Sequence, residues 1–294
     1  MSCGNTRANL QNHCMIAKIS KPTIPLVCLT TTAFAAEGGH KLPLNAEQLP
    51  GLAFTNSMIM TWIATAILIV FAQIASKKVT KVPQGFANFA EWVVESLYDF
   101  LQGILGDHLV KKTFWFFASL FLFILTTNWL GLFPGVGTIG WNMDSSHPLP
   151  LLRGGNADVN MTSAMGVLAS VTWLFWAIQE NGVKGFLAHI FAPKGKAKGV
   201  MAIVMLVVFF IVGILEVVSI GIRPLALTFR LFGNIYAGEQ ALEALLAMVP
   251  GWLKFAPPLI FYFMELLVGM IQALVFTLLT AVFLNLICDH GDEH

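Results

Sequence analysis

Long apolar runs, separated by short polar stretches, dominate the chain. Five of these runs are long enough to cross the roughly 30 Å of hydrocarbon in a bilayer, which takes about 20 helical residues. The predicted spans are residues 52–75, 114–133, 161–178, 200–248 and 253–287. The pattern therefore predicts an all-α membrane protein with five transmembrane helices, in a single membrane domain covering residues 52–294.

Between the first two spans, residues 84–110 show a different pattern. Their apolar positions, among them Phe89, Trp92 and Leu97, recur at helical spacing with the carboxylates of Glu91 and Glu95 between them. A helix with one apolar and one charged face is typical of the membrane interface. We expect an amphipathic helix that lies along the membrane surface, in addition to the five spans.

The last two spans are longer than a bilayer requires. A continuous helix over residues 200–248 would be about 70 Å long at 1.5 Å per residue, so it must tilt steeply, kink, or both. Gly221 and Pro224 supply a place for a kink. Pro250 and Gly251 then turn the chain into the fifth span, which predicts a long tilted helical hairpin.

The N-terminal residues have the pattern of a secretory signal peptide. Two lysines within residues 16–21 precede a short apolar stretch, residues 23–34, and Ala33-Phe-Ala35 forms a small-x-small cleavage site before Ala36. We interpret residues 1–36 as a leader, with Met15 as a possible start, and residues 37–51 as an outer segment. An uncleaved tail is the alternative.

Lysines cluster after the first span, before the second, and between the third and fourth. By the positive-inside rule this side is cytoplasmic, so the N-terminus lies outside and the C-terminus inside. The signal-peptide pattern agrees with this topology. A leader on a five-span chain favours a bacterial inner membrane, with a plastid origin as the alternative.

The composition excludes several classes of protein. Hydrophobic residues make up 56% of the chain, charged residues only 11%, and the net charge is +1, so neither a soluble globule nor a nucleic-acid partner is expected. The four cysteines form no CxxC pair and no zinc-ligand spacing. Because there is also no phosphate loop or nucleophile motif, we expect no metal, no cofactor and no catalytic centre within this chain.

Arg230 lies far from either end of the fourth apolar run. A charge at this depth costs about 2.5–3.5 kcal/mol on insertion scales, and arginine does not lose its proton. Either Arg230 belongs to a structural ion pair, or it belongs to an ion pathway.

Helical geometry separates these two interpretations. Folding the last two spans about Gly251 brings Arg230 to the depth of Gln272 and Glu239 to the depth of Glu265. At 100° per residue, a stripe of charged, amide and small residues falls within about 40° of Arg230. The stripe contains Glu216, Arg223, Ala226, Asn234, Ala237, Ala241 and Ala244. Glu239 falls almost opposite this stripe, so carboxylates are expected on both sides of the arginine, which favours the ion pathway.

The same residues carry a family resemblance. Glu216-x6-Arg-Pro-x5-Arg-Leu-Phe-Gly-Asn-x-Tyr-Ala-Gly-Glu239, followed by Gln272-Ala-x-Val-Phe, resembles subunit a of the F-type ATP synthase. Thr127-Asn-x-Leu-Gly-Leu-Phe-Pro134 and Ala157-Asp-Val-Asn-x-Thr162 extend the similarity across all five spans.

The resemblance implies a proton-translocating stator subunit beside a rotating ring of proteolipid subunits c, held by the peripheral-stalk subunit b and coupled indirectly to a soluble ATP-hydrolysing head. Arg230 matches the essential arginine of the family. Its polar neighbours are matched by Asn234, Glu239 and Gln272, an inner carboxylate by Glu216, and the outer start of the third span by Asp158 and Asn160. Glu265 stands where some members have histidine, and Arg223 where some have lysine.

Two other classes of membrane protein fit less well. A secondary transporter usually shows internal repeats, and none is visible between the halves of this chain. A purely structural or assembly protein would not account for the residues around Arg230. The choice between H⁺ and Na⁺ as the transported ion depends mainly on the ring.

Amino-terminal sequencing of the purified protein tests the leader. We expect the mature chain to begin directly after Ala33-Phe-Ala35, because this cleavage pattern ends an apolar stretch that is too short to span a membrane. A mature chain that begins at Met1 would contradict cleavage.

Overall fold

The computed structural model describes residues 46, 54–77, 85–133, 136, 140–141, 149–191, 200–248 and 256–288. The predicted leader and nearly all of the outer segment that follows it lie outside the described residues.

Five long helices make up most of the described chain. They are α2 (Asn56–Lys77), α3 (Phe86–Gly131), α4 (Val159–Phe191), α5 (Val200–Met248) and α6 (Ala256–Cys288). A short 3-10 helix, η1 (Gly155–Ala157), precedes α4, and the two-residue strands β2 (Gly140–Trp141) and β3 (Leu149–Pro150) pair antiparallel. Each of the five helices contains a stretch long and apolar enough to cross a membrane, which confirms the predicted five-span fold.

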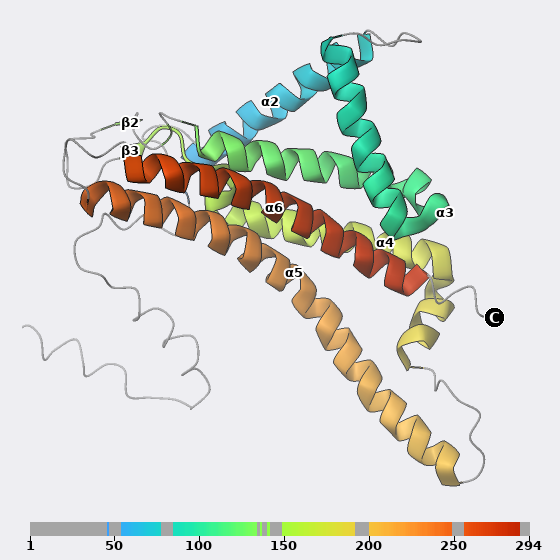
Figure 1. Cartoon of the computed structure of the whole chain (residues 1–294). Coiled ribbons are helices and arrows are strands. Elements are labelled where there is room, and N and C mark those ends of the chain that lie inside the picture. Colours follow the sequence, from blue (N-terminus) through green and yellow to red (C-terminus); the bar gives the residue numbers. More distant parts are fainter. Residues whose placement is uncertain are drawn as a thin grey trace, which may run out of the picture. The chain divides into compact units, whose positions relative to one another are not determined.

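Helix α3 consists of two arms that meet at Gly106. Its φ of 72° and ψ of 169° are not helical, and this conformation is essentially restricted to glycine. The first arm, residues 86–105, carries the amphipathic pattern, whereas the second arm contains the second span. Figure 1 shows the two arms running in different directions. The position of the first arm at the membrane surface stays a prediction.

Helix α4 also continues beyond its predicted end, through a break at Gly182. The short piece that follows, residues 183–191, ends with the ring of Phe191 against that of Phe210 on α5, with centroids 5.9 Å apart. A methyl group added at Gly213 of α5 would overlap the Phe191 ring. The end of α4 therefore packs closely against the first half of α5.

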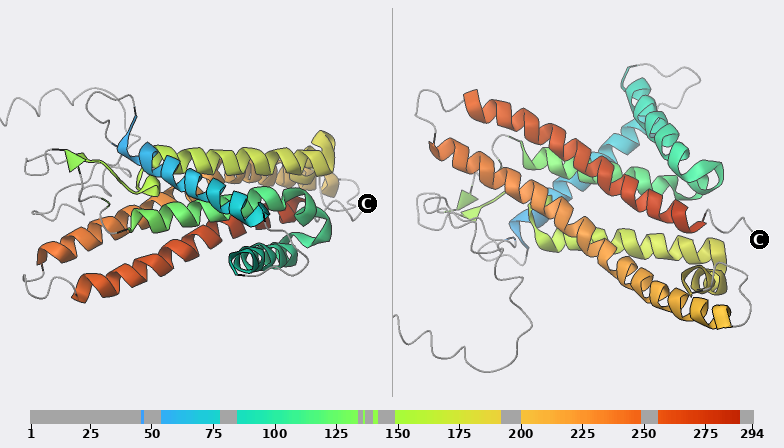
Figure 2. Two further views of the ribbon diagram at one scale, coloured as in Figure 1. Left: turned by 90° about the horizontal axis from the view of Figure 1, so that it is seen from above. Right: turned by 60° about the horizontal axis from the view of Figure 1, so that its bottom comes forward.

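The long helix α5 remains helical through Pro224. Its C-terminal half lies along α6, while its first half diverges from α6 (Figures 1 and 2). The first half contacts the end of α4 through Phe210 and Gly213, and the second half contacts α6 through Asn234 and Gly238.

The buried core is formed by the two arms of α3 together with α4, α5 and α6. Its fully buried side chains include Leu101, Val110, Phe117, Ile124, Ala169, Ala177, Leu231, Ala273, Phe276, Ala281 and Leu284. Many other large apolar side chains, such as Phe210, Leu215 and Phe229 on α5, are exposed. Exposed apolar side chains on membrane-length helices are expected where lipid or other subunits cover them.

Replacing Gly106 with alanine should destabilise the protein by about 1–3 kcal/mol, because the new side chain would strain the backbone at the turn between the two arms. Thermal unfolding of the purified protein in detergent measures this change.

Gly103→Ala is the matched control, because Gly103 lies within the first arm and an added Cβ there meets no atom within 4 Å. It should leave stability unchanged or slightly increased. Equal melting temperatures for the two variants would contradict the role assigned to Gly106.

Candidate functional site

Arg230 lies on an exposed face of α5. Most of the predicted stripe shares this face, since Ala226, Asn234, Ala237, Ala241 and Ala244 are also exposed. Within the described part of the chain, the Arg230 side chain makes no hydrogen bond or ion pair. The alternative interpretation, a structural ion pair, would need an acidic partner for Arg230, and none is found among the described residues.

Gln272 is joined to the same face of α5 through Asn234. The Nδ2 of Asn234 donates to the Oε1 of Gln272 at 3.2 Å, and Gln272 itself is only 4% exposed. Folding about Gly251 predicts Arg230 at the depth of Gln272. The structure places the contact one turn further along α5, at Asn234.

Glu265 is buried between α5 and α6, with 7% of its surface exposed. Its carboxylate rests directly on Gly238, where an added methyl group would overlap it. Gly238 is the residue before Glu239, which the folding about Gly251 places at the depth of Glu265. The Oε1 of Glu265 has no hydrogen-bond partner among the described residues, so this carboxylate is held mainly by close packing.

Glu239 faces a different side of α5. Its Oε1 would lie 2.7 Å from a Cβ added at Gly154, just before η1. The two acidic residues, Glu239 and Glu265, therefore occupy one level of the protein but turn toward different neighbours. Glu265 lies at the α5–α6 interface, whereas Glu239 lies beside the chain that leads into α4.

Glu216 forms an ion pair with Arg223, seven residues along α5. The Arg223 Nη2 lies 2.9 Å from the Glu216 Oε1. The guanidinium carbon is also 4.5 Å from the ring centroid of Phe283 and 5.5 Å from that of Trp173. The sequence placed Glu216 and Arg223 on the same helical face as Arg230, and in the structure these two residues pair with each other.

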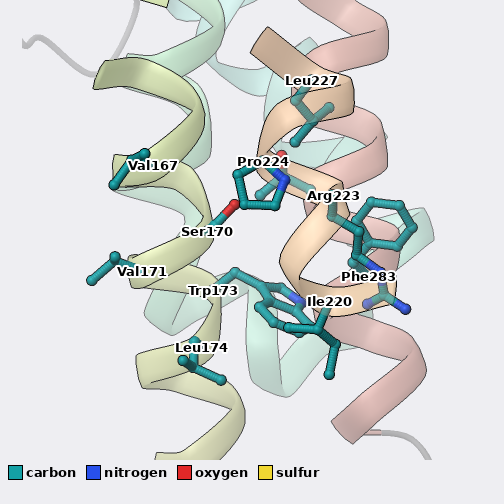
Figure 3. A pocket seen from close by; sticks show the side chains of 11 residues that line it. Val167, Ser170, Val171, Trp173, Leu174, Ile220, Arg223, Pro224, Leu227 and Phe283 are labelled. Carbon is teal, nitrogen blue, oxygen red and sulfur yellow. The ribbon is translucent and has the colours of Figure 1, made fainter. Parts of the chain in front are cut away.

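A cavity of about 210 Å³ lies beside this ion pair, between α4, α5 and α6. Figure 3 shows Arg223, Trp173 and Phe283 gathered at one end of it. Its other walls are mainly apolar, with Val167 and Val171 from α4.

Asp158 lies at the start of α4, where it connects that helix to α2. Its Oδ1 accepts a hydrogen bond from the backbone N–H of Asn160 at 3.0 Å, and its Oδ2 accepts one from the Ser57 hydroxyl at 2.8 Å. A carboxylate that caps a helix N-terminus is favourable. The side chain of Asn160 takes no part in this cap, since only its backbone donates.

Sequence reasoning missed a group of buried polar residues near Asp158. These are Asn56, Ser57, Thr127, Asn128, Arg153 and Asn156. Arg153, which the sequence places in the polar connection before the third span, is only 4% exposed, and its Nη2 donates to the Ala157 carbonyl at 3.2 Å. A signal was present, because Thr127 and Asn128 open one of the short motifs that carry the resemblance and Asn156 directly precedes another.

Five membrane-length helices, with amides, carboxylates and an arginine that has no ion pair among the described residues, define a multi-pass membrane protein organised around polar positions within its spans. Residues 58–285 match the family model described as ATP synthase A chain. The chain is 32% identical over 240 residues to ATP synthase subunit a of Gloeobacter violaceus, covering 81% of this chain and 86% of the relative. It is 33% identical over 236 residues to ATP synthase subunit a of Solidesulfovibrio magneticus, covering 80% and 85%.

The chain therefore belongs to the ATP synthase A chain family, the subunit a of the membrane sector of ATP synthase. This confirms the resemblance found in the sequence motifs.

Proposed function

We propose that this chain translocates protons in the membrane sector of ATP synthase, providing two offset aqueous half-channels and an essential arginine, Arg230. Arg230 couples ion flow to rotation of a proteolipid ring, which drives ATP synthesis or ATP-driven pumping. One observation carries the proposal. Arg230 is exposed, makes no ion pair within the described chain, and lies on a face of small residues.

This face suits a second helix that carries a carboxylate. Small residues allow another helix to approach closely within the membrane. A permanent cation in hydrocarbon is costly, so its counter-charge must come from a neighbouring chain. A ring of subunits, each bearing one carboxylate at mid-membrane, would supply both the helix and the charge.

The charges dictate the order of events. A ring carboxylate surrounded by lipid is protonated, because a bare anion there is costly. Beside Arg230 the cation favours the ionised form, so the proton leaves through one half-channel. The other half-channel then reloads the next carboxylate. Because Arg230 blocks direct passage, net flow requires rotation, and each charge that crosses 100 mV contributes about 2.3 kcal/mol.

The remaining residues divide between the two half-channels. Asp158, Glu239, Glu265 and Gln272 line the outer path. Asn234 donates a hydrogen bond to Gln272 and so links this path to the face that carries Arg230. Glu216 and its partner Arg223 belong to the inner path, and Asn160 stands at the outer start of α4. The acidic pair at one level, Glu239 and Glu265, makes the outer path more acidic than it would be with a histidine.

The partners follow from the same proposal. They are the proteolipid ring, the peripheral-stalk subunit b and, indirectly, the soluble head that hydrolyses or makes ATP. The membrane is the bacterial inner membrane, with the N-terminus outside and the C-terminus in the cytoplasm. Co-purification with proteolipids and a nucleotide-hydrolysing head separates this proposal from a transporter or an assembly protein.

Arg230→Ala should abolish ATP-driven proton pumping into inverted vesicles, because no fixed charge would then separate the two half-channels. Acidification of the vesicle interior, measured with a pH-sensitive dye with and without added Na⁺, reports the pumping and the ion.

Lys184→Ala is the control, since Lys184 is an exposed cation on α4 away from the stripe. It should pump normally. If the Arg230 variant still pumps in a fully assembled complex, the central assignment is wrong.

Glu265→Gln should lower passive proton conductance several-fold, a milder effect than loss of Arg230. The glutamine amide cannot take up and release a proton as the glutamate carboxylate does. Conductance is measured in vesicles stripped of the soluble head. Glu95→Gln, which removes an exposed carboxylate on the first arm of α3, should have no effect. Unchanged conductance in the Glu265 variant would exclude Glu265 from the outer path.

A further inference from the structure

Two motifs that are far apart in the sequence meet at Asn156. This residue is 0% exposed and lies in η1, immediately before α4. Its Nδ2 donates to the hydroxyl of Thr127 at 2.8 Å and to the Oδ1 of Asn128 at 2.6 Å, both near the end of α3. The start of α4 and the end of α3 are therefore joined by buried, directional hydrogen bonds.

The contact with Asn156 also determines how Asn128 is oriented. Because the Oδ1 of Asn128 accepts from Asn156, its Nδ2 points the other way and donates to the backbone carbonyl of Gly269 on α6 at 2.8 Å. The next residue, Trp129, donates from Nε1 to the carbonyl of Leu266 at 3.2 Å. Two consecutive side chains of α3 thus bind backbone carbonyls of α6 that lie three residues apart.

The backbones also come close at this point. A Cβ added at Gly269 would lie 3.2 Å from the Cβ of Asn128, tighter than ordinary van der Waals contact. Apolar packing alone would tolerate a slide or rotation of one helix along the other, but a hydrogen bond to a particular carbonyl does not. Asn128 and Gly269 therefore set both the depth and the rotation of α6 against α3.

The stretch of α6 held in this way carries two residues of the site. Glu265 lies four residues before Gly269, and Gln272 lies three residues after it. Both lie on the same face of α6 as Gly269 and also meet α5, Glu265 at Gly238 and Gln272 at Asn234. A shift of α6 would move both contacts together.

We infer that Asn128, oriented by Asn156, is a positioning residue that sets the register of α6 against α5, so that Glu265 and Gln272 reach the outer proton path. Its role in transport rests on the function proposed above, but its effect on register is a separate claim. Asn128 touches no proton-carrying carboxylate itself and acts through α6.

Asn128→Leu is the principal variant, because leucine keeps most of the side-chain volume and removes both hydrogen bonds. Gly269→Ala is the second variant, since it leaves every hydrogen-bonding group in place and presses α6 away from α3. If the Asn128→Leu variant does not assemble, Gly269→Ala tests the positioning role. Thr113→Ala is the matched control, because Thr113 is buried in α3 and its hydroxyl binds only the Leu109 carbonyl of its own helix.

The experiment uses the whole complex in inverted vesicles and two measurements. The first is the yield of a disulfide between cysteines placed at Asn234 and Gln272, in a background without native cysteines, which reports the register of α5 and α6. The second is the passive proton conductance as a function of pH in the otherwise unchanged protein. We expect Asn128→Leu and Gly269→Ala, the two principal variants, to lower the disulfide yield and the conductance several-fold and to displace the pH profile of conductance. Thr113→Ala should change none of these.

The outcomes separate the two claims. If the disulfide yield and the conductance stay unchanged in both principal variants while Glu265→Gln lowers conductance, the positioning role is wrong and the channel role of Glu265 stands. If the disulfide yield falls but Glu265→Gln leaves conductance unchanged, the register role of Asn128 is supported and only the channel role of Glu265 is overturned.

Discussion

A permanent positive charge within a membrane helix is the constraint on which the rest of this protein depends. Arg230 cannot lose its proton and finds no ion pair among the described residues, and in the function proposed above a carboxylate of a neighbouring ring subunit supplies its counter-charge. That requirement accounts for the small residues along the same face of α5, because a second helix can supply a carboxylate only if it approaches closely. The excess length of α5 gives this face room to extend for several turns on either side of the arginine.

The carboxylates of the candidate site are held in different ways. Glu216 is neutralised within α5 by Arg223, which also stacks on aromatic rings. Glu265 is buried against a glycine and depends on close packing, so small shifts of α6 would alter its surroundings. The hydrogen bonds from Asn156 through Asn128 to α6 oppose such shifts. The hydrogen bond to the Gly269 carbonyl lies about one helical turn from both Glu265 and Gln272, so it acts directly on the part of α6 that carries the polar site.

The pattern of apolar residues predicted the helices but not the breaks within them. The five spans follow from the length and polarity of each run, since a bilayer demands about 20 apolar helical residues. The turn within α3 lies at Gly106 and the break in α4 at Gly182 because glycine alone tolerates their backbone angles. Neither could be singled out, because the other glycines along these helices look the same in sequence.

The sequence by itself determined the number of spans and the family, since these depend on hydropathy and motif spacing. It also placed Glu239 away from Arg230 by helical phase alone. Only the tertiary structure decided that Glu216 pairs with Arg223, that Glu265 rests on Gly238, and that two distant motifs meet at Asn156. These contacts depend on how closely neighbouring helices approach, and local spacing carries no information about that distance.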